Sequence, residues 1–221
     1  MHIGLIGGIG PAATDFYYRG LIAKAAAANK DLDLTIAHAD SPTLLSNMAA
    51  GNHEAQSAVY QKLTHRLKAA GAECVVITSI SGHFPIDHFE AVSPLPVINL
   101  LSILRNWLHE NGAKRVGLLG TNTVMATAMH GKLDGIDIVI PQAETIDLVH
   151  DTYVDLALSG VPTDQHRSVF FGEGEKLVRD QGAQAILLGG TDLNVAFEGH
   201  SPPFDVIDCA SIHIDAIATK L

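Results

Sequence analysis

The chain has 221 residues, of which 47% are hydrophobic and 17% are charged, so it can bury the core of one large domain or two small ones. A formal net charge of −10, with no basic run, argues against nucleic acid or an anionic membrane surface as a partner. We expect neither a signal peptide nor a membrane span, and therefore a cytoplasmic protein. Cys74 and Cys209 are too few for a disulfide framework and lie in apolar contexts typical of core thiols.

In chain order, strand-like apolar runs alternate with segments of helical period. The predicted helices cover residues 11–29, 56–70, 100–111, 145–158 and 164–181. The runs at 75–77 and 185–188 are continuously apolar, as strands buried on both faces require. This alternation predicts an α/β fold with parallel sheets flanked by helices.

The strand-like runs form an internal near-repeat. Residues 3–7 resemble residues 116–120. Three further pairs of segments follow in the same order along the chain, namely 33–37 with 137–141, 71–79 with 182–190, and 96–99 with 205–208. Such a repeat predicts two small parallel-sheet domains related by a pseudo-twofold axis. We expect the first domain to comprise residues 1–98 plus a C-terminal helix at 209–221, and the second to comprise residues 99–208. Ligands of parallel α/β sheets bind beyond the carboxyl ends of the strands.

The first of these strand ends carries a glycine-rich loop. Residues 8–13 satisfy the G-x-G-x-x-A dinucleotide fingerprint, with Asp40 as the acidic candidate, although the spacing from Ala13 to Asp40 exceeds the roughly 20 residues expected. A backbone nest for a small carboxylate at a helix that starts with Pro11 is the second interpretation. A glycine turn without a ligand is the third.

Four loops together resemble the signatures of the aspartate/glutamate racemase superfamily, and they occur in the right order along the whole chain. These loops are Gly7 to Thr14, Ser79 to His83, Gly120 to Thr123, and Leu188 to Asp192. The resemblance implies a pseudo-symmetric two-domain fold, a site in the interdomain cleft that needs no cofactor, an amino acid or related small carboxylate as ligand, and a homodimer.

The resemblance also implies a mechanism that this sequence alters. In such racemases one cysteine ends the third strand of each half, and one thiol removes the α-proton while the other returns one. Here Ser79 stands where the family pattern is Cys-Asn-Thr-Ala-His, and Gly190 stands where it is Cys-Thr-Glu. Cys74 lies five residues before Ser79, roughly 16 Å away along a strand, so it cannot substitute. A two-thiol mechanism is therefore excluded by residue type.

Two alternatives remain for the first position. Ser79 and His83 form a catalytic pair if the segment is helical. Alternatively, Ser79 and Ser81 only bind substrate oxygens, and His83 is hydrogen-bonded in the wall of the cleft. The expected binding residues are those of the four loops, namely Gly8, Gly10, Pro11, Ser81, Gly82, Thr121, Asn122, Thr123, Thr191 and Asp192.

Substrate selection departs from the family as well. Family members that act on dicarboxylic amino acids usually have an arginine in the loop after the second strand. The corresponding loop expected here, His38 to Gly51, has none, since no arginine occurs between Arg19 and Arg66, so recognition of a distal carboxylate is in doubt. That loop offers polar side chains instead, namely His38, Asp40, Ser41, Asn47 and Asn52. The twelve histidines show no H-E-x-x-H pattern, and we expect no metal. We therefore expect an enzyme with altered chemistry, an isomerase or else a lyase or hydrolase. The alternative is a noncatalytic relative that binds a small carboxylate or a partner protein.

Overall fold

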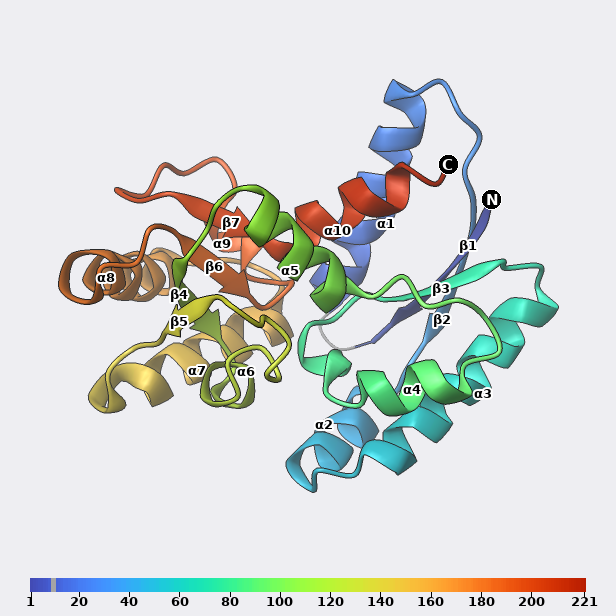
Figure 1. Cartoon of the computed structure of the whole chain (residues 1–221), viewed down its shortest axis with the longest axis horizontal. Coiled ribbons are helices and arrows are strands. Elements are labelled where there is room, and N and C mark those ends of the chain that lie inside the picture. The colour runs from blue at the N-terminus through green and yellow to red at the C-terminus, as the bar shows by residue number, and fades with distance from the viewer. Residues whose placement is uncertain (9–10) are drawn as a thin grey trace. The chain divides into compact units, whose positions relative to one another are not determined.

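The computed structural model describes residues 1–8 and 11–221. The chain divides into two compact units, each an α/β layer structure (Figure 1). Unit 1 comprises Met1–Leu100 and His213–Leu221, and unit 2 comprises Leu101–Ile212. Within the described residues, no helix combines the length and the apolar character that a membrane span requires.

Unit 1 is built on a three-stranded parallel sheet. Its strands are β1 (His2–Gly7), β2 (Asp33–His38) and β3 (Cys74–Ile77), in the order β2-β1-β3, and Val97 adds an isolated parallel bridge to Val75. The helices are α1 (Pro11–Ala27), α2 (Ser41–Ala49), α3 (His53–Ala69), the 3₁₀ turn η1 (Ser81–His83) and α4 (Ile86–Val92). All four residues of β3 are buried, as its continuous apolar run predicts.

Unit 2 repeats this plan with one more strand. The strands β4 (Arg115–Gly120), β5 (Asp137–Val139), β6 (Ile186–Gly189) and β7 (Val206–Asp208) are parallel, in the order β5-β4-β6-β7. The helices are α5 (Leu100–Glu110), α6 (Asn122–Ala126), α7 (Ala143–Ser159), α8 (Asp164–Gln181) and α9 (Asn194–Phe197). The bridge at Val97 in unit 1 stands in the place of β7, so the predicted repeat of four strand positions is confirmed.

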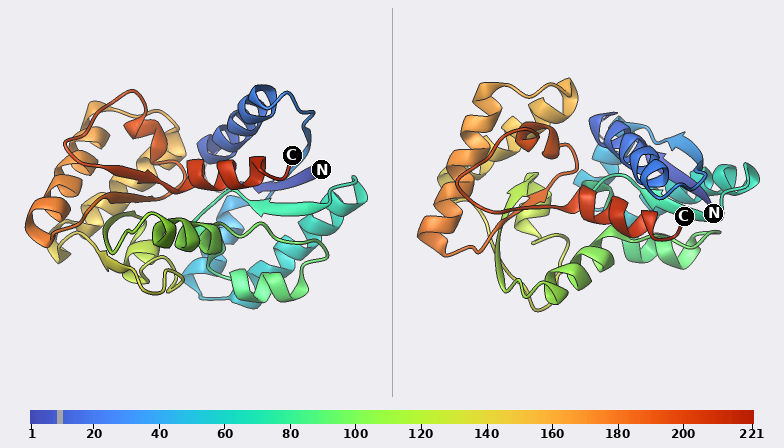
Figure 2. Two further views of the ribbon diagram at one scale, coloured as in Figure 1. Left: turned by 45° about the horizontal axis from the view of Figure 1, so that its top comes forward. Right: turned by 90° about the horizontal axis from the view of Figure 1, so that it is seen from above.

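The chain ends in α10 (Cys209–Ala218), which returns to unit 1 at His213. Figure 2 shows this helix beside α1, and the Tyr17 hydroxyl lies 2.8 Å from His213 Nδ1. Both cysteines are buried as predicted, and burial is the main cause that raises the pKa of each thiol. Neither thiol is therefore in the microenvironment of a reactive cysteine.

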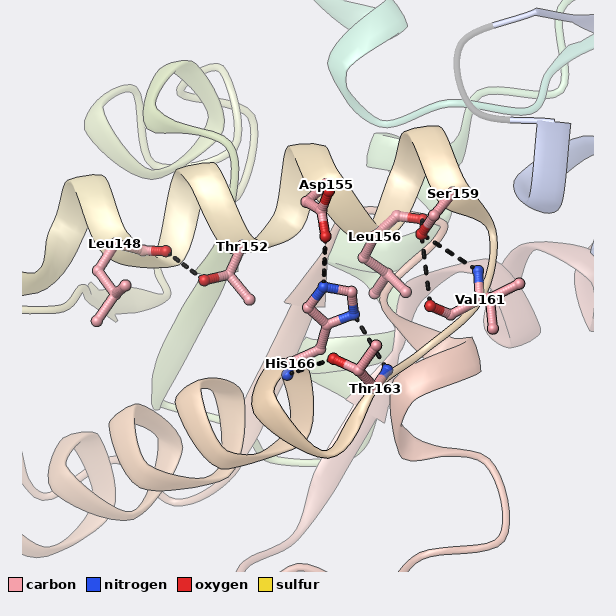
Figure 3. A network of polar contacts seen from close by, with 8 residues as sticks. All are labelled: Leu148, Thr152, Asp155, Leu156, Ser159, Val161, Thr163 and His166. Atoms are coloured by element: carbon pink, nitrogen blue, oxygen red, sulfur yellow. Dashed lines mark hydrogen bonds and ion pairs between the residues drawn. The ribbon is translucent and has the colours of Figure 1, made fainter.

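Helix α8 begins with a capping box, which Figure 3 shows. The Thr163 hydroxyl accepts the His166 backbone N–H at 3.2 Å, and His166 Nδ1 accepts the Thr163 N–H at 3.2 Å. Because Nδ1 is an acceptor, Nε2 carries the proton and donates to Asp155 of α7 at 2.8 Å. One side chain thus caps α8 and connects it to the preceding helix.

The five predicted helices are all present, with ends that differ by up to three residues. The expectation of a loop after the second strand was wrong, because α2 occupies most of that segment. Its start follows ordinary capping chemistry, since the Asp40 carboxylate accepts the Thr43 N–H at 2.9 Å and Pro42 lies in the first turn.

Candidate functional site

The first group of predicted residues lies at the carboxyl ends of β1 and β3, and we call it the unit 1 half-site (Gly7, Gly8 and Ser79 to His83). The two strand ends are joined by Thr78, whose backbone N–H donates to the Ile6 carbonyl oxygen at 3.0 Å. Its hydroxyl lies 3.3 Å from the Thr14 hydroxyl of α1. The loop after β3 therefore starts from a fixed position at the edge of the sheet.

Ser79 and His83 contact each other through the backbone of the serine. His83 is fully buried, and its Nδ1 lies 2.5 Å from the Ser79 carbonyl oxygen. A carbonyl oxygen can only accept, so Nδ1 is the donor and Nε2 of the neutral ring holds the lone pair. The Ser79 hydroxyl oxygen accepts the Gly82 N–H at 3.2 Å, and the Tyr60 hydroxyl donates to the Gly82 carbonyl oxygen at 3.0 Å. These contacts fix the turn that carries the predicted pair.

A second histidine lies close enough to His83 to interact electrostatically with it. His213 is fully buried, and its Nε2 donates to the Ile98 carbonyl oxygen at 2.9 Å, which leaves Nδ1 to accept the Tyr17 hydroxyl proton. Burial, and then the electrostatic interaction with His83, lower the pKa of His213 to about 3. His213 therefore stays neutral at physiological pH.

The glycine-rich loop borders a pocket of unit 1 with a volume of about 500 Å³. Gly8 has a φ of 142°, and a Cβ at this position would collide with the Ala39 carbonyl oxygen, so only glycine fits there. Two predicted binding residues, Gly8 and Pro11, line the pocket, whereas Gly10 lies outside the described residues. The other lining residues are Gly7, Thr14, Asp15, Tyr18, Ile36, His38 and Ser41.

The polar side chains that follow β2 divide into two groups. His38 and Ser41 line the pocket, and the Ser41 hydroxyl donates to the Gly8 carbonyl oxygen. Asp40 and Asn52 instead cap helices α2 and α3, and Asn47 donates to the Gln56 side chain at 2.9 Å. Three of the five polar candidates in this segment therefore have structural contacts within the chain.

The second group of predicted residues lies at the carboxyl ends of β4 and β6, and we call it the unit 2 half-site (Gly120 to Thr123 and Gly189 to Asp192). The Thr121 hydroxyl caps α6 by accepting the Val124 N–H at 3.3 Å. Asn122 donates its side-chain amide to Asp147 at 2.9 Å and its backbone N–H to His150 Nδ1 at 3.3 Å. The loop is thus held against helix α7.

Gly190, at the second catalytic position, lies against the ring of Tyr153 from α7. A Cβ at position 190 would lie 2.6 Å from Tyr153 Cζ and 2.8 Å from its hydroxyl oxygen. Tyr153 is 6% exposed and Asp192 is 1% exposed, and the phenol donates to the carboxylate at 3.2 Å. Burial, followed by the Asp192 charge, raises the pKa of Tyr153 well above its usual value. The space for a side chain at position 190 is therefore filled by a protonated phenol.

Two amide oxygens of unit 2 are buried without a hydrogen-bond partner in the part of the chain that the structure describes. These are Oδ1 of Asn122 and Oδ1 of Asn194, which follow β4 and β6 respectively. A buried acceptor left unpaired costs about 1–3 kcal/mol, so a ligand that donates protons at either position would be favoured. No group of three or more His, Cys, Asp or Glu side chains among the described residues is placed to hold a metal ion.

Sequence reasoning missed Tyr153 and its neighbours Asp147 and His150. All three come from α7, where they are spaced as one face of a helix. Nothing local marks them as functional residues. The one available signal was Gly190 itself, because a buried glycine in a side-chain position requires a neighbouring group to fill the space.

Two parallel α/β units, each with its polar loops at the carboxyl ends of its strands, place this protein among the duplicated α/β proteins. The family model for Asp/Glu/Hydantoin racemases matches residues 6–217, so the chain belongs to that family.

Several solved structures are similar over nearly the whole chain. A candidate Asp/Glu racemase from Yersinia pestis is 25% identical with a TM-score of 0.81, covering 100% of this chain and 99% of that one. An aspartate racemase homologue from Pyrococcus horikoshii OT3 is 23% identical with a TM-score of 0.81, covering 99% of each chain. A glutamate racemase from Francisella tularensis in complex with D-glutamate is 15% identical with a TM-score of 0.67, covering 100% of this chain and 80% of that one. At these identities the last two bear on the fold alone.

Proposed function

We propose that this protein is an enzyme that exchanges the α-proton of an amino acid or a related small carboxylate without a cofactor, and that His83 is its base. The observation that carries the proposal is the contact between His83 Nδ1 and the Ser79 carbonyl oxygen, which leaves Nε2 as the proton acceptor. An imidazole nitrogen can accept and return a proton as a general base and acid, the role that a thiol has in the family mechanism.

The proposed step breaks the bond between the α-carbon and its hydrogen. Nε2 of His83 takes the proton, and the electron pair of that bond moves into the carboxylate, which becomes an enediolate. Ser79 supports the step in two ways, because its carbonyl oxygen orients the ring and its hydroxyl proton can be donated to a substrate oxygen. An isomerase follows if a proton returns to the carbon, and a lyase or hydrolase follows if another bond breaks.

Substrate binding is assigned to both half-sites. In unit 1, the pocket bordered by Gly8 and Pro11 contains Asp15 and His38 and, among its described lining residues, neither lysine nor arginine, which disfavours a substrate with a distal carboxylate. In unit 2, the amide oxygens of Asn122 and Asn194 are acceptors for an ammonium group. It remains a prediction that the two half-sites meet in one interdomain cleft. The homodimer also remains a prediction.

The test is proton NMR in D₂O with the proteinogenic amino acids as L- and D-enantiomers, in which loss of the α-proton signal marks exchange. The His83→Asn variant keeps a donor for the Ser79 carbonyl oxygen but lacks Nε2, and we expect exchange to fall about 10²–10⁴-fold. His88→Gln changes an exposed histidine of the neighbouring helix α4 and serves as the matched control. Its exchange rate should equal that of the wild type.

Each other outcome has a definite meaning. Exchange that persists in His83→Asn would place the base elsewhere. No exchange with any amino acid, together with thermal stabilisation by one of them, would favour the noncatalytic relative that binds a small carboxylate. No exchange and no stabilisation would retire amino acids as ligands and favour a partner protein.

A further inference from the structure

Tyr153 occupies the space in which a side chain at position 190 would act. Its hydroxyl oxygen lies 2.8 Å from the position of a Cβ on Gly190, about the distance that separates Cβ from the far atoms of a short side chain. The phenol therefore presents an oxygen at the end of β6, where ligands of parallel α/β sheets bind. The phenol is contributed by helix α7 and not by the loop that follows the strand.

The surroundings of the phenol favour a proton donor over a base. Asp192, two residues after Gly190, accepts the phenol proton at 3.2 Å, and both side chains are almost completely buried. Burial and the adjacent carboxylate raise the pKa of Tyr153, so the hydroxyl keeps its proton at neutral pH. A protonated phenol beside a carboxylate is held in one orientation and can give up a proton when a stronger base forms next to it.

We propose that Tyr153 is the proton donor of the unit 2 half-site and that Asp192 is the residue that positions it. This inference rests on the proposed function. The phenol O–H bond breaks, its proton bonds to the α-carbon, and the electron pair of the enediolate forms the new C–H bond. The phenolate then takes one proton from water while the protonated His83 releases one to water, so the net reaction is isomerisation.

The proposal separates two events that the two-thiol mechanism combines. A single base can remove a proton and return a deuteron to the same face of the carbon, which gives exchange without inversion. Inversion requires a donor other than that base. Removal of the phenol hydroxyl should therefore reduce inversion while exchange continues.

The experiment measures both rates in D₂O with the same L- and D-amino acids, using NMR for exchange and chiral chromatography for inversion. In Tyr153→Phe we expect inversion to fall about a hundredfold or more while exchange stays within about tenfold of the wild type. Asp192→Asn should lower the ratio of inversion to exchange in the same direction, by about tenfold, which a purely structural role would not do. The control is Thr152→Val, which removes a hydroxyl from the adjacent position of α7 and should change neither rate.

Two results would overturn the inference, and they are distinguishable. If the wild type inverts an amino acid and Tyr153→Phe inverts it equally fast, Tyr153 is not the donor, although the proposed function stands. If the folded wild type exchanges none of the amino acids, the proposed function fails and the role of Tyr153 fails with it. A variant that does not fold is recognised by circular dichroism, and Asp192→Asn then provides the ratio.

Discussion

A methyl group at position 190 has no room beside the ring of Tyr153. The nearest ring carbon, Cε2, would lie 2.3 Å from the new Cβ, whereas carbon atoms pack at about 3.5 Å, so the ring must move by about 1 Å. The backbone at Gly190 does not have a left-handed φ, so the cost of Gly190→Ala comes from packing. Overpacking costs about 1–3 kcal/mol, and loss of the phenol contact with Asp192 costs about 1.5–3 kcal/mol. We expect the free energy of unfolding to fall by about 2.5–6 kcal/mol.

The assay is urea-induced unfolding followed by tryptophan fluorescence, because the single tryptophan, Trp107, belongs to unit 2 together with Gly190. Gly172→Ala is the matched control, since its Cβ would meet no atom within 4 Å in the middle of α8. That change should raise the free energy of unfolding by about 0.5–1 kcal/mol.

A double-mutant cycle tests whether the collision with the ring is the cause. Tyr153→Ala alone should cost about 3–5 kcal/mol, because it removes a buried aromatic ring. In the double variant the methyl group of Gly190→Ala enters the vacated space, so the summed costs should exceed the double-variant cost by about 1–3 kcal/mol. A cost below about 0.5 kcal/mol for Gly190→Ala, or additive costs in the cycle, would refute this account of the packing.

Three further predictions concern the glycine loop, the helix cap and the buried histidine. Gly8→Ala should lower the free energy of unfolding by about 2–4 kcal/mol, because its Cβ meets the Ala39 carbonyl oxygen. Gly51 also has a positive φ, but a Cβ there would meet no atom within 4 Å, so Gly51→Ala should cost only about 1 kcal/mol. Thermal unfolding measures both costs. His166→Ala should cost about 1–2 kcal/mol in the fluorescence assay, because α8 loses half of its capping box, and a cost near zero would contradict the role of the cap. His213 has a folded pKa of about 3 and an ordinary value of 6.5, so the unfolded chain binds the extra proton and stability falls as pH drops from 6.5 toward 3. Its contribution between neutral pH and pH 5.5 is about 1.4 kcal/mol, and the pH dependence in His213→Gln should be smaller by that amount, while an unchanged dependence would place the titration elsewhere.

The fold was predictable because its signals are repeated and local. Continuous apolar runs at 75–77 and 185–188 identify central strands, and both β3 and β6 are completely buried. Helix α2 was missed although its start carries a signal that could have been used, since Asp40 followed by Ser41 and Pro42 is a typical N-terminal cap. Its nine residues include four polar ones, Ser41, Thr43, Ser46 and Asn47, that also suit a loop.

The positions of the candidate site residues were predictable only where these residues follow a strand. The Ser79 to His83 turn and the Thr121 loop come from strand ends, so their places along the chain determine their places on the sheet. Tyr153 comes from the middle of α7, and its contact with Gly190 depends on how that helix docks on the sheet. Helix docking is set by side chains far apart in sequence, which the local pattern does not contain.

Gly190 and Tyr153 therefore have to be understood as one feature. A cysteine at position 190 would begin with the same Cβ that collides with the ring, so Gly190→Cys alone places no thiol at the end of β6 unless the tyrosine moves. At the other half-site, Ser79 already has a hydroxyl oxygen that accepts the Gly82 N–H, and a thiol there meets no such obstacle among the contacts that hold the turn. A two-thiol site would thus require a smaller residue at 153 besides both cysteines. The absence of the second thiol is coupled to a large side chain from another helix, which is the reason to assign the second half-site its own proton donor.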